Sequence, residues 1–89
     1  MSSDPDAAEA LEALTLLRAN DYSPGPQWKK AHEIAQAHEG EAVFDHIHAI
    51  VHRIEGDEGN ARYWYHRAGI EPSEASIVDE LEALSASLS

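Results

Sequence analysis

Cysteine is absent from the 89-residue chain. This absence excludes disulfide bonds, a thiolate nucleophile, an iron–sulfur cluster and a zinc site built on cysteine, and it fits a reducing compartment. The chain also lacks any apolar run near the roughly 18 residues that span a bilayer, and its start has neither the basic nor the apolar region of a signal peptide. We therefore expect a cytoplasmic protein without a membrane partner.

Basic residues are scarce, since six Lys and Arg face 17 Asp and Glu for a formal charge of −11. Binding to nucleic acid or to anionic lipid needs clustered positive charge, so neither partner is expected. The acids gather in the flanks, with a formal charge of −4 over residues 1–21 and −5 over 71–89, against −2 over 22–70. All histidine, tryptophan, tyrosine and phenylalanine residues lie in the middle segment, which is therefore where we expect the chemistry.

Common catalytic motifs are also missing. The chain has no GxSxG, GxxxxGK[ST], GxGxxG or HExxH pattern, so no activated nucleophile or phosphate-binding loop can be identified. Imidazoles beside carboxylates leave general acid–base catalysis open, but an enzyme is not the expected function. No cofactor is expected beyond a zinc or nickel ion.

Helical periodicity without strand-like alternation predicts an all-α fold, a compact bundle of four to five short helices in one domain over residues 1–89. Asp4 is the expected N-cap of the first helix, and the SPGP segment separates it from the second. The expected helices end near Asn20, at Gly40, at Gly56 and at Gly69, and a fifth follows Pro72 and Ser73. Short connections predict antiparallel neighbours.

The first and last helices are acidic and rich in leucine. In the last helix Ile77, Leu81, Leu84 and Leu88 follow one another in steps of four and three, the spacing of a packed or coiled seam. This seam can join the helices of one chain or two copies of the chain.

The middle segment resembles two known patterns. Ala49, Ala61, Tyr65, Ala68 and the turn Gly56-Asp57 resemble one tetratricopeptide or Sel1-type helix pair, although His52 replaces an aromatic residue and no second copy follows. WKKAHEIAQ, IHA, HRIEGD and NARYWYHRAG together resemble the signature of an uncharacterised family of small helical proteins of bacteria and fungi over residues 28–69. The resemblance implies a fold but no activity and no functional residue.

A polar stripe along the third helix is the candidate metal site. Asp45, His48, His52 and Glu55 follow at steps of three, four and three, so they share one helix face. Two imidazoles at i and i+4 can bind one divalent ion, with Glu55 adding an oxygen and His66 or the His32-Glu33 pair supplying another ligand. The alternative is a solvated helix face on which the carboxylates accept hydrogen bonds from the imidazoles.

The fourth helix carries a candidate partner-binding surface, made of Arg62, Tyr63, Trp64 and Arg67. Aromatic residues beside arginine are typical of binding hot spots. The alternative is that Trp64 packs in the core against Trp28 or Phe44 while the arginines pair with nearby glutamates, and a small-anion site is a third interpretation. As a function we predict a non-enzymatic interaction module that self-associates through its leucine-rich helices, with a histidine-based metal-binding protein as the alternative.

Overall fold

The structure is a computed structural model that describes residues 5–89, so the predicted N-cap Asp4 lies outside the described part. The described residues form helices joined by short connections, with no strand among them, which confirms the predicted all-α bundle. The helices are α1 (Pro5–Ala19), α2 (Pro26–Ala37), α3 (Ala42–Ile54), α4 (Glu58–Ala68) and α5 (Ile77–Leu88).

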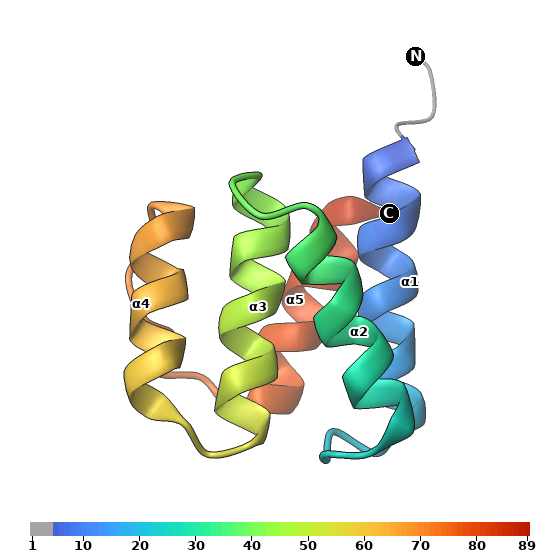
Figure 1. Ribbon diagram of the computed structural model, residues 1–89, viewed down its shortest axis with the longest axis horizontal. Coiled ribbons are helices and arrows are strands. Elements are labelled where there is room, and N and C mark those ends of the chain that lie inside the picture. The colour runs from blue at the N-terminus through green and yellow to red at the C-terminus, as the bar shows by residue number, and fades with distance from the viewer. Residues whose placement is uncertain (1–4) are drawn as a thin grey trace.

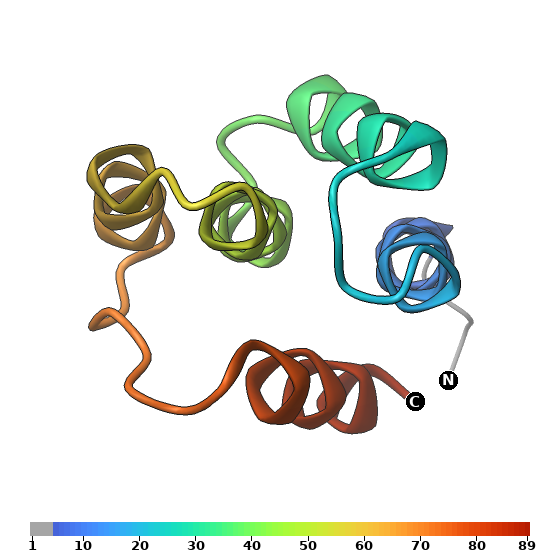
Figure 2. The ribbon, with the colours of Figure 1, turned by 90° about the horizontal axis from the view of Figure 1, so that it is seen from below.

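Helices α1 to α4 stand side by side in chain order, each antiparallel to the one before it (Figure 1). Seen from below, α5 lies on one side of this row of helices, next to α1 and α3, against which it packs (Figure 2). The main hydrophobic core lies between α1, α2, α3 and α5. Helix α3 packs against each of the other four helices, whereas α4 packs against α3 alone. Helix α3 is therefore the central element of the fold.

The helix ends follow the local sequence with two differences. Gly69 ends α4 in the left-handed conformation, at φ 78°, and the side chain of Asp57 caps its start by accepting from the backbone N–H of Asn60. Helix α2 ends at Ala37, before the expected Gly40. Helix α5 begins at Ile77 rather than next to Ser73, because Ser76 caps it by accepting from the backbone N–H of Asp79.

The leucine seam is used inside the chain. Leu14 and Leu17 of α1 and Leu81 of α5 have no exposed surface, and Leu84 and Leu88 pack half-buried against the same core. Self-association through the leucine-rich helices stays a prediction. Within one copy of the chain, however, Leu14, Leu17 and Leu81 are already buried in the same core.

A buried carboxylate connects the last three helices. Glu80 of α5 accepts hydrogen bonds from Arg53 Nη1 at 2.6 Å, Tyr65 Oη at 2.6 Å and His46 Nε2 at 2.9 Å. Burial alone would raise the pKa of Glu80, but the three hydrogen bonds lower it instead, so the carboxylate is held in its charged form. This network links α4 and α5, whose backbones do not pack against each other.

Candidate metal centre

Three imidazoles meet where α2 packs against α3. His32 belongs to α2, and His48 and His52 lie one turn apart on α3. One nitrogen of each ring can be chosen so that all three lie within 4.8 Å of one another. The helix pair thus brings together three nitrogen donors from positions up to 20 residues apart in the sequence.

The closest pair is His32 Nε2 and His48 Nε2, which are 3.0 Å apart. At this distance one of the two nitrogens must donate a proton to the other, because two lone pairs would repel. Two histidine nitrogens bound to one tetrahedral zinc ion at its usual bond lengths lie about 3.3 Å apart. An ion bound by both nitrogens would therefore need this pair to separate by a few tenths of an ångström, and it would need the His52 nitrogen, which lies within 4.8 Å of both, to reach the same spacing.

The two α3 histidines of this group are buried, so the alternative of a solvated helix face is wrong for them. His48 is 3 % exposed and His52 is 9 % exposed. Burial, together with the nearby His32 and His52, lowers the pKa of His48 from 6.5 to about 4. Burial and His52 likewise lower the pKa of His32. These two rings are therefore neutral at neutral pH, which is the form that binds metal ions.

Aromatic neighbours fix the orientation of the rings. The ring of His48 stacks on that of Trp64, with centroids 3.8 Å apart and planes 10° from parallel, and on that of His52, at 5.0 Å and 15°. Trp28 donates its indole N–H to the carbonyl of Val51 and lies 5.5 Å from the ring of His32. The donor set is thus held by packing before any ligand binds.

Glu55 lies next to the donor set but is not one of its members. His52 Nδ1 is 2.6 Å from Glu55 Oε2, a short hydrogen bond in which the imidazole donates to the carboxylate. A proton on Nδ1 leaves the lone pair of His52 on Nε2, and this carboxylate–histidine arrangement is the usual outer support of a metal-binding imidazole.

Asp45 is also outside the donor set. Its carboxylate is 1 % exposed, and its Oδ1 accepts a hydrogen bond from the backbone N–H of Gly40 at 3.1 Å. Of the four predicted ligands, His48 and His52 therefore lie in the group, and the third member is His32, which the sequence offered only as one of several additional ligands. His66 and Glu33 are exposed and lie outside the group.

The predicted partner-binding residues separate into two environments. Trp64 is buried against His48, not against Trp28 or Phe44 as the core alternative predicted. Tyr63 is 51 % exposed, with the guanidinium of Arg67 over its ring at 5.8 Å. Arg67 pairs with Glu39 at 3.4 Å, and Arg62 is exposed without an ion pair among the described residues.

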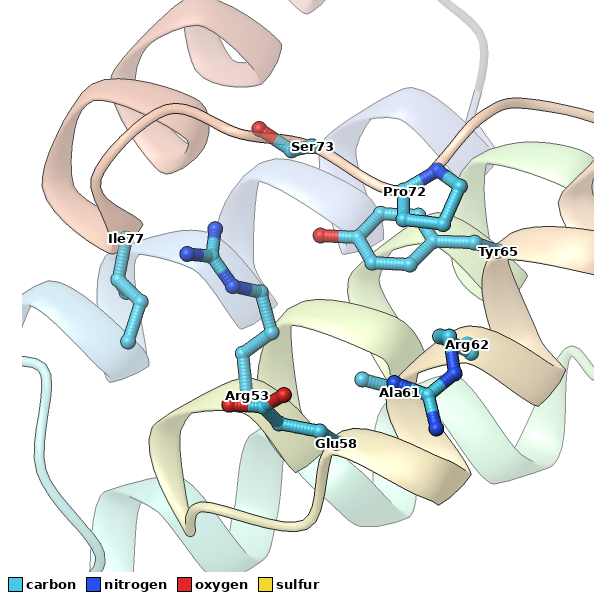
Figure 3. Close-up of a pocket in the computed structure, with 8 residues that line it drawn as sticks. All are labelled: Arg53, Glu58, Ala61, Arg62, Tyr65, Pro72, Ser73 and Ile77. Atoms are coloured by element: carbon cyan, nitrogen blue, oxygen red, sulfur yellow. The ribbon is translucent and has the colours of Figure 1, made fainter.

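A separate half-open cavity of about 350 Å³ lies between α4 and the segment that leads to α5 (Figure 3). Arg53 and Arg62 line it from different helices, but the guanidinium of Arg53 is already bound to Glu80 and to the carbonyl of Ala75. Glu58 lines the same cavity and offsets the charge of Arg62. The cavity is therefore a weaker candidate for an anion than the imidazole group is for a cation.

Two further groups of potential ligands occur in the described part of the chain. One joins Asp6, Glu9 and His38 near the surface, and the other joins His52 with Glu55 and Asp57. Neither contains more than one imidazole.

No family model matches the chain, and neither the curated proteins nor the solved structures contain a match to it. The resemblance to the small helical family and to a tetratricopeptide-type pair thus stays a prediction. Among residues 5–89 no helix is long and apolar enough to cross a membrane.

Proposed function

We propose that the protein binds one divalent transition-metal ion, zinc or nickel, through the imidazoles of His32, His48 and His52. The observation that carries this proposal is the convergence of three nitrogen donors from two helices within 4.8 Å. Neutral imidazole is the nitrogen donor that zinc, nickel and copper favour, whereas magnesium and calcium favour oxygen. A group of three histidines therefore favours the transition metals.

Three protein ligands leave a tetrahedral ion with one free position, which water or an exogenous ligand fills. Because the chain has no cysteine, the ion would be bound without thiolates. Binding would also cross-link α2 to α3, so an ion bound only by the folded state stabilises the fold.

The test is metal titration of untagged protein stripped with chelator, followed by calorimetry and thermal melting. With free metal at 100 times Kd, the gain is about 2.7 kcal/mol, or an increase of about 10 to 20 °C in Tm for a domain of this size. We expect one ion per chain. His32→Ala and His48→Ala should each abolish the shift, and His66→Ala, which removes an exposed imidazole outside the group, should keep it.

The group of Asp6, Glu9 and His38 could bind the same ion, so His38→Ala is the control variant for this second site. Binding that is lost in His38→Ala but kept in His32→Ala would assign the ion to the surface group and overturn the proposal. Absence of any metal-dependent shift in the parent protein would also overturn it.

Protein binding through α4 is a second candidate function, favoured by the exposed ring of Tyr63 with Arg67 over it. Because Trp64 is buried, the surface would consist of Arg62, Tyr63 and Arg67. If copies of the chain associate through this surface, the mass measured by light scattering should rise with protein concentration. Tyr63→Ala should then reduce it to the monomer mass. A monomer mass for the parent at all concentrations would remove this form of the hypothesis.

A further inference from the structure

Two buried side-chain atoms in the described part of the chain have no hydrogen-bond partner, and they are Asp45 Oδ2 and His48 Nδ1. Both belong to α3, where positions three residues apart lie on one face about one turn from each other. One atom is a carboxylate oxygen, which accepts, and the other is an imidazole nitrogen, which donates when protonated. An unsatisfied buried polar group is costly and rare, so two on one face next to a candidate metal site require an explanation.

The tautomer of His48 connects these atoms to the metal centre. Its Nε2 is the nitrogen that lies 3.0 Å from His32 Nε2, inside the donor group. A metal ion on Nε2 requires the proton of the neutral ring to be on Nδ1, which then needs an acceptor. The buried acceptor without a donor on the same helix face is Asp45 Oδ2.

Charge points to the same residue. Three neutral imidazoles leave the two positive charges of a divalent ion uncompensated, and a buried uncompensated charge is strongly disfavoured. Glu55 already accepts a hydrogen bond from His52 at 2.6 Å and supplies one negative charge next to the group. The carboxyl group of Asp45, which is 1 % exposed, lies on the same helix face and is the candidate for the second.

We propose that Asp45 is a positioning residue of the metal centre: when the ion is bound, Asp45 Oδ2 accepts the Nδ1 proton of His48 and fixes the tautomer that presents Nε2 to the metal. Asp45 then acts on His48 as Glu55 acts on His52, from outside the coordination sphere. This inference rests on the proposed zinc or nickel binding. It also replaces the sequence-based assignment of Asp45 and Glu55 as direct ligands.

Asp45→Asn is the most informative variant because it keeps the shape and one acceptor oxygen for the Gly40 N–H. Its amide nitrogen is a donor and cannot accept the Nδ1 proton of His48, so the variant loses the acceptor that the tautomer with a free Nε2 requires, and this opposes metal binding. We expect zinc affinity, measured by competition with a chromogenic chelator, to fall 10- to 100-fold. Glu55→Gln should produce a loss of similar size, and Asp79→Asn, at an exposed position in α5, should produce none.

A spectroscopic measurement separates this role from a structural one. ¹⁵N NMR of the imidazoles should show His48 of the zinc-loaded parent with the proton on Nδ1 and the metal on Nε2. In Asp45→Asn without metal, we expect the proton on Nε2. Zinc bound to His48 through Nδ1 in the parent would overturn the inference even if the variant failed to fold.

The two proposals fail in different ways. A parent protein that binds no zinc removes the metal centre itself. If the parent binds zinc through His32 and His48, but Asp45→Asn keeps both its affinity and its His48 tautomer, the metal centre remains and the role of Asp45 is wrong. A weaker affinity without any change of tautomer would show that Asp45 does not act through the tautomer of His48, which also overturns the inference.

Discussion

Acidification should destabilise the metal-free protein through His48. Its folded pKa of about 4 lies below the ordinary 6.5, so the unfolded chain binds the proton more tightly between these values. The stability that this neutral, buried ring contributes is therefore fully present above pH 6.5 and is lost as the pH falls toward 4. From these two pKa values, the loss between pH 7 and pH 5 is about 2 kcal/mol.

The shifted pKa values of His32 and His38 also contribute to the change of stability with pH. The lowered pKa of His32 adds to the loss on acidification. Hydrogen bonding to Glu41, together with the charge of Glu9, raises the pKa of His38, so His38 has the opposite effect. Its stabilising contribution is present at low pH and disappears as the pH rises through its folded pKa. His38→Gln removes that opposing term from the comparison.

The assay is urea denaturation of the parent and of His48→Gln at pH 7 and pH 5, each with chelator and in the His38→Gln background. His48→Gln lowers stability at both pH values, but its pH-dependent loss should be smaller than that of the parent by about 2 kcal/mol. This difference corresponds to about 1 to 2 M in the urea midpoint. Equal pH dependence in the two proteins, or a parent that gains stability at pH 5, would refute the assignment of His48 as a buried neutral imidazole.

Two predictions concern the bundle itself. Glu80→Ala should lower the free energy of unfolding by about 3 to 5 kcal/mol because it leaves Arg53 without its buried partner. Glu80→Gln keeps hydrogen-bonding atoms and should lower it less. Equal melting temperatures for the parent and both variants would contradict this role of Glu80. Leu81→Asp should unfold the domain, whereas Val78→Asp at an exposed position of the same helix should leave its circular dichroism unchanged. Loss of an oligomer with full helicity in Leu81→Asp would instead place the leucine seam between two copies.

The sequence determined the features that depend on neighbouring residues. The left-handed glycines Gly56 and Gly69 that follow α3 and α4, the cap at Asp57 and the i, i+4 placement of His48 and His52 all depend on residues close together in the chain. The start of α5 could not be determined in this way. Ser73 and Ser76 are both plausible N-caps, the sequence placed the start next to Ser73, and only the fold shows that Ser76 is the cap.

Tertiary structure alone decided which faces are covered. The sequence left a solvated helix face as the alternative for the polar stripe of α3, but α3 packs against all four other helices, so Asp45, His48 and His52 are buried while Glu55 stays exposed. His32 joined His48 and His52 because α2 packs against α3, a contact that no spacing within one helix can specify. Sequence periodicity determines which residues share a face, whereas burial of that face depends on the packing of the whole chain, and that packing made three histidines one candidate metal centre.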